Sequence, residues 1–234
     1  MNLEKRSSVI FILISFIAVS LHAVDVDPFQ LAKTGDLESL REMILKQPEL
    51  TKLQDKRRST LLHHAVNGGF QKLTTFLVER GVDMEARDID GDTALHWAAA
   101  AGKTGIARYL ISRKAELDVR NRRKQSPLFY AIQQRKSETA ISLIEAGAEL
   151  NFQDFIGKTV LHNAVISRQF DVVKALVVRG ASMAVRSFND ETPVIYAIRA
   201  RDPKMVCFFL DNGVPLNFAL NDGMGLLHYA AALD

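Results

Sequence analysis

A four-residue pattern recurs every 33 residues along this chain, and that period constrains the fold more than any other feature of the sequence. Residues 93–96, Thr-Ala-Leu-His, match residues 60–63 one period earlier and residues 159–162 two periods later. Weaker copies begin at residues 27, 126, 192 and 225, so the pattern occurs seven times without an insertion. A period of about 20–50 residues is typical of a stack of small units, each burying its apolar face against its neighbours.

Each copy begins with a residue type that favours the start of a helix. The first positions are Asp27, Thr60, Thr93, Ser126, Thr159, Thr192 and Gly225. The side-chain oxygens of Asp, Ser and Thr accept hydrogen bonds from the free N–H groups of a first helical turn. Proline follows the cap at Pro28, Pro127 and Pro193, where its missing N–H leaves no helical bond unmade. We therefore predict that a helix starts at every copy.

A second set of apolar columns predicts a second helix in each unit. One column reads Leu40, Leu73, Ile106, Thr139, Val172 and Met205, and the next reads Ile44, Leu77, Leu110, Leu143, Leu176 and Phe209. The spacing of four residues between the columns places both on one helical face. Glycines that suit a left-handed turn follow at Gly81, Gly147, Gly180 and Gly213. Lys114 stands in the same column, which predicts a strained or differently shaped turn there.

The unit therefore consists of a cap, a helix, a turn, a second helix, a glycine turn and an extended loop. In this the chain resembles the ankyrin-repeat family, whose T-P-L-H-x-A pattern and 33-residue period it shares. The resemblance implies an all-α solenoid of helix-turn-helix units joined by hairpin-like loops. We expect an ankyrin-repeat domain over residues 24–234, with about six repeats and a partial C-terminal repeat. The resemblance also implies a binding scaffold, without naming its partner.

Histidine occupies the fourth position of four copies, close to acidic residues such as Asp88, Asp90 and Asp92. One histidine per unit cannot share a metal ion with the next, because packed helices lie about 8–10 Å apart and a zinc–nitrogen bond measures about 2 Å. The acidic residues also lack the glycine and glutamate spacing of a calcium loop. We predict instead that each imidazole bonds the cap hydroxyl and the neighbouring backbone. The predicted structural caps are Thr60 with His63, Thr93 with His96, and Thr159 with His162.

The composition is that of a globular chain and gives no sign of catalysis. The net charge is only +3 and 24% of the residues are charged, so the basic pI is no argument for nucleic acid binding. The sequence contains no nucleophile elbow, no glycine-rich phosphate loop and no HExxH zinc motif. Cys207 falls on a predicted second helix, where we expect a buried or half-buried, inert thiol. We expect no enzymatic activity, cofactor, metal ion or nucleic acid partner.

Residues 1–23 have the organisation of a secretory signal peptide. Two basic residues precede an uncharged apolar run over residues 9–21, and small residues follow it. The run is short for a permanent membrane anchor. Cleavage fits either after Ala23, which we favour, or after Ser20. The signal peptide predicts export, without a stable membrane span after cleavage. The chain has a single cysteine and therefore no intramolecular disulfide, which favours a bacterial protein that is periplasmic or secreted.

By the resemblance, partners meet the tips of the loops between repeats and the exposed side of the first helices. The candidate partner-binding residues at those tips are Lys56, Arg57, Ile89, Asp90, Arg122, Arg123, Phe155, Ile156, Phe188 and Asn189. Two tips are strongly basic, one is acidic, and the last two carry apolar groups. Apolar residues on adjacent turns are typical of contact sites. The hypothesis is a partner protein with acidic groups for the three arginines and apolar surface for the phenylalanines and the neighbouring isoleucine.

The expected function is a non-catalytic scaffold for protein–protein interaction that is exported from the cytoplasm. Two alternatives stay open: an accessory or chaperone-like factor that supports an exported enzyme, and a secreted effector whose active segment lies beyond residue 234. The copy that begins at residue 225 stops where its second helix should start. Since half a unit rarely buries its own apolar face, this favours a fragment of a longer protein.

Overall fold

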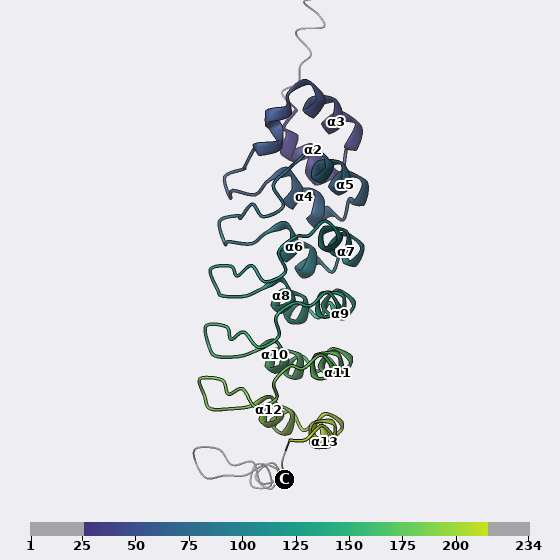
Figure 1. The fold of residues 1–234 in the computed structure, drawn as a ribbon. Coiled ribbons are helices and arrows are strands. Elements are labelled where there is room, and N and C mark those ends of the chain that lie inside the picture. The colour runs from purple at the N-terminus through teal and green to yellow at the C-terminus, as the bar shows by residue number, and fades with distance from the viewer. Residues whose placement is uncertain (1–25, 215–234) are drawn as a thin grey trace, which may run out of the picture.

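The repeats form a single solenoid. The computed structural model describes residues 26–214, in which twelve α-helices and one short 3-10 helix follow one another along the chain. The helices stack in pairs along one axis, and the loops between pairs project to one side (Figure 1). The expected all-α solenoid of helix-turn-helix units is confirmed. The predicted signal peptide and the copy that begins at residue 225 lie outside the described residues.

The first helix of each pair is the inner one, because it lies between the projecting loops and the second, outer helix (Figure 1). The inner helices are α2 (Pro28–Thr34), α4 (Leu61–Gly68), α6 (Ala94–Ala101), α8 (Pro127–Gln133), α10 (Val160–Ile166) and α12 (Pro193–Arg199). The outer helices are α3 (Leu37–Lys46), α5 (Gln71–Glu79), α7 (Thr104–Ser112), α9 (Ser137–Glu145), α11 (Phe170–Val178) and α13 (Pro203–Asp211), and the 3-10 helix η1 (Pro48–Lys52) follows α3. Every predicted helix start within the described residues is confirmed to within a residue.

The apolar columns of the sequence form one continuous core between the two rows of helices. Leu77, Leu110, Leu143 and Leu176 of the outer helices are all fully buried. The recurring alanines of the inner helices, such as Ala65 and Ala98, are equally buried and let neighbouring helices approach. Each unit of a repeat stack contacts only its neighbours. The apolar surface buried between neighbouring units therefore supplies most of the stability of the stack.

Each predicted cap histidine links two repeats through its two ring nitrogens. In the repeat of His96, the backbone N–H of Thr93 donates to the ring Nδ1 at 3.1 Å. The ring Nε2 lies 3.1 Å from the carbonyl oxygen of Gln125 in the next repeat. Because Nδ1 accepts, the proton belongs on Nε2, which donates to that carbonyl. His63 and His162 repeat this geometry toward the carbonyls of Asp92 and Glu191 at 3.1 and 3.0 Å.

Two repeats have an apolar residue in the histidine column, and one of them leaves a polar atom without a partner. Phe129 and Ile195 stand there, both buried. The hydroxyl oxygen of Thr192, the cap residue of the second of these repeats, is buried and has no hydrogen-bond partner among the described residues. A column that alternates between histidine and apolar side chains belongs to the packing of the stack, which agrees with the structural role predicted for it.

The turn prediction for Lys114 is confirmed, and the side-chain prediction for Cys207 is wrong. Lys114 has a φ of 67°, so its turn keeps the left-handed shape of the glycine turns and the lysine carries the strain. Arg135, Arg168 and Arg201, at the turns between the two helices of their repeats, also have left-handed backbone, with φ values of 55°, 54° and 49°. Cys207 is exposed, and not buried as expected, because it lies on the side of α13 opposite the buried Phe209 and Met205. Within residues 26–214, no helix combines the length and apolar character needed to cross a membrane.

Removing a side chain from the middle of this core should be costly. We expect Leu110→Ala to lower the free energy of unfolding by about 2–5 kcal/mol, through lost burial and the cavity left behind. Urea denaturation followed by circular dichroism measures this. Val178→Ala, at a side chain that is 78% exposed on α11, is the control and should change stability by less than about 0.5 kcal/mol. Equal effects of the two substitutions would contradict the assigned core.

The buried histidines should make folding sensitive to acid. Burial disfavours the imidazolium form, which lowers the pKa of His96 and of His162 from 6.5 to about 4, and also lowers that of His63. The unfolded chain takes up these protons near pH 6.5, whereas the folded chain resists until about pH 4. The contribution of the neutral imidazoles to the free energy of unfolding is therefore fully present above pH 6.5. It is lost as the pH falls from 6.5 to about 4, by up to about 3 kcal/mol each for His96 and His162.

Nuclear magnetic resonance titration of the histidine rings checks this directly. The rings of His96 and His162 should titrate near pH 4 in the folded protein and near pH 6.5 in urea. Nitrogen chemical shifts should also show the proton on Nε2 at neutral pH. Midpoints near 6.5 in the folded protein would mean that these imidazoles are not buried acceptors.

Candidate functional site

The candidate interface consists of the hairpin-like loops and the inner helices beside them (Figure 1). The structure places all ten predicted contact residues on the tips of five successive hairpins. Nine of them are exposed, and Asp90 is half-buried. The tips turn at residues with left-handed backbone, namely Arg58, Gly91, Lys124, Gly157 and Asp190. The sequence therefore predicted the position of these residues correctly, while their role in binding stays a prediction.

Carboxylate and amide side chains hold the hairpins in shape. Asp88 Oδ1 accepts from the backbone N–H groups of Asp90 and Asp92, at 2.9 Å each. Asp55, Asn121 and Asp154 make the same pair of bonds in their own hairpins. This explains Asp88 near the histidine column, since its carboxylate acts on the backbone of its own hairpin. No group of three or more potential ligands is placed to hold a metal ion within residues 26–214.

Backbone hydrogen bonds join neighbouring hairpins into a stack. The N–H of Ile89 donates to the carbonyl of Arg57 at 2.8 Å, and the N–H of Arg122 donates to that of Asp90 at 3.0 Å. Further along, the N–H of Phe188 donates to the carbonyl of Ile156 at 3.2 Å. These bonds hold the first three tips at fixed positions relative to one another, and likewise the fourth and fifth.

The basic tips differ in how available their charges are. Arg57 Nη2 pairs with Asp90 Oδ2 of the next hairpin at 2.9 Å, with 66% and 49% of the two side chains exposed. Exposed pairs of this kind contribute little to stability. Arg122 and Arg123 are exposed and form no ion pair with any residue that the structure describes. The third hairpin therefore offers the two arginines to an acidic partner more freely than the first offers Arg57.

The fourth and fifth tips form an exposed apolar surface. Phe155 is 58% exposed, Ile156 39% and Phe188 74%. The Phe188 ring lies directly against Gly157, so close that a Cβ on that glycine would come within 2.6 Å of the ring. Glycine at this tip thus lets the neighbouring ring lie across the hairpin. We refer to Phe155, Ile156 and Phe188 as the apolar tip patch.

A pocket opens between the hairpins and the inner helices. Asn67, Asp92, His96, Trp97, Ala100 and Tyr130 line it, and its volume is about 300 Å³. Asp92 is only 8% exposed, and it accepts hydrogen bonds from Asn121 Nδ2 at 2.8 Å and from the Tyr130 hydroxyl at 3.0 Å. Burial raises the pKa of Asp92, and burial together with this carboxylate raises the pKa of Tyr130 to about 12. We call this the inner-helix pocket.

Sequence reasoning did not identify these pocket residues. Trp97 and Tyr130 stand one position after the histidine column, where His64 and Tyr196 are their equivalents. The Nε2 of His64 lies 2.9 Å from the Oδ2 of Asp55, within hydrogen-bond distance. The available signal was a half-buried column of aromatic and polar residues at a position that faces the loops. Such a column predicts lining residues of a groove and not a particular ligand.

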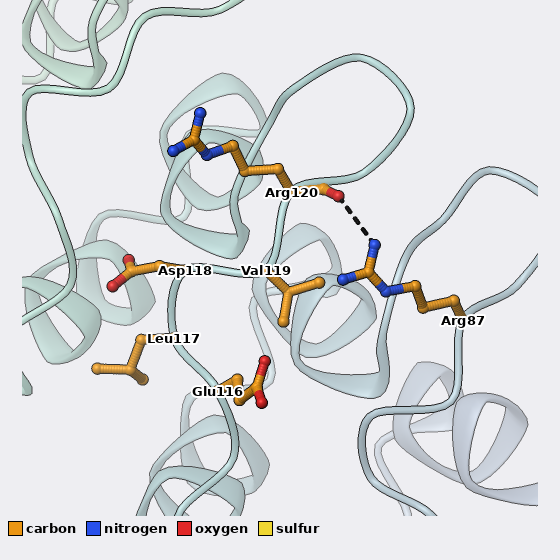
Figure 2. Close-up of a pocket in the computed structure, with 6 residues that line it drawn as sticks. All are labelled: Arg87, Glu116, Leu117, Asp118, Val119 and Arg120. Carbon is orange, nitrogen blue, oxygen red and sulfur yellow. Dashed lines mark hydrogen bonds between the residues drawn. The ribbon is translucent and has the colours of Figure 1, made fainter.

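A second hollow, of about 560 Å³, lies where the segments from the outer helices lead into the hairpins. Figure 2 shows Arg87 donating to the backbone carbonyl of Arg120, at 3.3 Å, on one side of this hollow. The Arg120 guanidinium packs instead on the ring of Phe152, at 3.4 Å from its centroid. Glu116 and Asp118 add charges of the opposite sign, and their side chains point in different directions (Figure 2). The mixture of charges indicates no single class of ligand.

Two solved structures share this fold closely. The ankyrin-repeat domain of Bcl-3, a member of the IkappaB family, superposes with a TM-score of 0.81 at 21% sequence identity, over 88% of this chain and 94% of that one. The human ASB11 ankyrin-repeat domain gives a TM-score of 0.74 at 23% identity, over 87% and 90% of the two chains. At such identities the likeness concerns the fold. No curated protein sequence matches the chain significantly.

The sequence itself identifies the family. The family model for ankyrin repeats, built on three copies of the repeat, matches residues 29–121 and 113–187, which is more than half of the chain. Together with the helix pairs, the histidine caps and the hairpin stack, this match shows that the chain belongs to the ankyrin-repeat family.

Proposed function

We propose that this protein is a non-catalytic scaffold that binds another protein through its hairpin tips. Ankyrin repeats generally serve as protein–protein interaction modules, and the fold itself is typically non-catalytic. The stack presents a long, fixed surface to a partner without a need for reordering, which reduces the entropic cost of binding. The partner itself is a protein of unknown identity.

The single observation that supports this proposal is the apolar tip patch. Three large apolar side chains, 39–74% exposed, occupy two adjacent hairpins that are hydrogen-bonded to each other. Scattered exposed apolar residues are normal, but contiguous ones mark contact sites. Aromatic residues are also enriched at the energetic centres of interfaces.

The basic tips extend the same surface toward the N-terminus. Arg122 and Arg123 lie on the hairpin next to Phe155, and Lys56 and Arg57 lie two hairpins further. Opposite charges across an interface speed association and fix the register of the two partners. We infer a partner that places apolar groups on the apolar tip patch and acidic groups on the neighbouring arginines.

We also propose that the protein acts after export from the cytoplasm. The support is the basic start and the apolar run within residues 1–23, which have the order of a signal peptide. Export in a bacterial host would bring the scaffold to a periplasmic or secreted partner.

Export is tested by expressing the full chain in a bacterium and sequencing the N-terminus of the protein recovered from the periplasm. We expect the mature chain to begin after Ala23 or after Ser20. Replacing residues 11–16 of the apolar run with serine should retain the uncleaved chain in the cytoplasm. Recovery of unprocessed protein from the cytoplasm alone would contradict the proposal.

The binding surface is tested by capture of a partner from the exported fraction with the mature chain, followed by titration of the purified partner. The double variant F155S/F188S should weaken binding at least about tenfold, since buried aromatic side chains dominate interface energy. The triple variant R57E/R122E/R123E should weaken binding by a similar factor and slow association, because it reverses three charges.

The matched control places charge reversals away from the hairpins. K46E/K72E changes exposed lysines of α3 and α5, on the outer row of helices. This variant should bind the partner like the unmodified chain. If the hairpin variants and the control bind equally well, the partner contacts another surface and the proposed interface is wrong.

A further inference from the structure

The inner-helix pocket holds negative charge that the protein does not neutralise. Both oxygens of Asp92 act as acceptors, from Asn121 and from the Tyr130 hydroxyl, which is the bonding pattern of an ionised carboxylate. Asp88, 3% exposed, also accepts at both oxygens, and one of its donors is the indole N–H of Trp97 at 3.1 Å. Neither carboxylate forms an ion pair with a lysine or arginine that the structure describes.

Buried carboxylates of this kind favour the entry of a cation. A charge taken out of water is costly unless an opposite charge or several hydrogen bonds compensate it. The hydrogen bonds of Asp88 and Asp92 come only from neutral donors. Arg87 and Arg123 lie in the same region, but Arg87 donates to the carbonyl of Arg120, and Arg123 is exposed on its hairpin.

The walls of the pocket suit an organic cation. Trp97 packs edge-to-face on His63 and Tyr130 on His96, at centroid distances of 5.3 and 5.8 Å, so both rings are held in place. Both rings are only half-buried and line the open space of about 300 Å³. An ammonium or guanidinium within about 6 Å of a tryptophan or tyrosine ring is attracted to its face.

The same chain places a cation of its own at the equivalent position two repeats further along. Lys158 and Tyr196 stand 66 residues after Asp92 and Tyr130. The Lys158 ammonium lies over the Tyr196 ring, 4.9 Å from its centroid. The scaffold thus accommodates an ammonium against this ring column, and the inner-helix pocket has the ring and a carboxylate without the ammonium.

We propose that the inner-helix pocket binds a lysine or arginine side chain of the protein partner, with its charge on Asp92 and its stem between Trp97 and Tyr130. This inference rests on the proposed protein-binding function. It adds a specificity for a basic side chain, which the hairpin tips do not provide. A long side chain fits because its aliphatic stem packs on apolar walls while its charged end reaches a carboxylate. The partner would therefore present an acidic and apolar surface to the hairpins and one basic side chain to the inner helices.

The pocket can be tested without the partner, because Trp97 is the only tryptophan of the chain and reports on the site itself. Its fluorescence is followed during titration with arginine amide and lysine amide at constant ionic strength. We expect a saturable change with a dissociation constant in the millimolar range. Citrulline amide and norleucine amide, which have similar shapes without the side-chain charge, should give no saturable change.

Two variants locate the response. Asp92→Asn removes the charge but keeps an amide oxygen for Asn121, and it should weaken binding of arginine amide about tenfold or more. Ala100→Arg, at a half-buried lining position on α6, should fill the pocket with its own guanidinium and abolish the response. Asp171→Asn is the matched control, since it removes an exposed carboxylate on α11 and should leave binding unchanged.

The Ala100→Arg variant keeps the test decisive if Asp92→Asn unfolds, because Ala100 is only half-buried and arginine is among the better helix formers. Equal responses to the charged and neutral amides would overturn the proposal, and so would unchanged binding in both pocket variants. Because no partner is present in the titration, such a result would leave the hairpin interface standing. Conversely, failure of the hairpin variants would leave a positive titration intact.

Discussion

The hydrogen bonds of the cap histidines hold three of the repeats at a fixed distance from the repeat that follows, and the hairpin surface depends on this spacing. Each imidazole accepts from the backbone of its own cap and donates to a backbone carbonyl of the next repeat. The bonds work only when the ring is neutral and carries its proton on Nε2. They fix where a helix begins and, at the same time, how far away the next hairpin lies. In the repeats that have a histidine, the start of the inner helix and the distance to the next hairpin are therefore held by the same side chain.

A fixed spacing makes the hairpins a single surface. The carbonyl of Asp92 accepts from His63 of the preceding repeat and from the N–H of Asp88 in its own hairpin. The helix stack and the hairpin stack are thus joined at one backbone atom. Side chains at the tips then lie at constant intervals, whatever their chemistry, which is why basic, acidic and apolar tips can follow one another without disturbing the fold. The buried columns hold the stack together, and the chemistry of the tips differs between repeats without disturbing those columns.

The fold could be predicted well because the same types of residue recur at equivalent positions every 33 residues. The place of each residue in the period was enough to assign Leu110 to the core, His96 to a cap and Arg122 to a hairpin tip. The prediction for Cys207 failed because the face it occupies was misjudged. Met205 and Phe209 stand in the buried columns, whereas Cys207 shares its place in the period with Arg108 and Lys174. The inner-helix pocket was missed for a different reason. It combines Asp92 and Trp97 of one repeat with Tyr130 of the next, and the geometry of the stack brings Tyr130 to the other two.

The column before the cap shows how such a scaffold acquires specificity. At Asp92, Gln125 and Glu191 the backbone carbonyl accepts the proton of a cap histidine, so the link between repeats uses the main chain of this column and not its side chain. Asp92 turns into the inner-helix pocket, whereas Lys158 in the same column covers the ring of Tyr196. A substitution in this column changes the charge beside the inner helices without breaking the hydrogen bond from the cap histidine to the backbone carbonyl. Binding preferences can therefore diverge at the positions closest to the structural bonds, because those bonds are made by backbone atoms that every residue possesses.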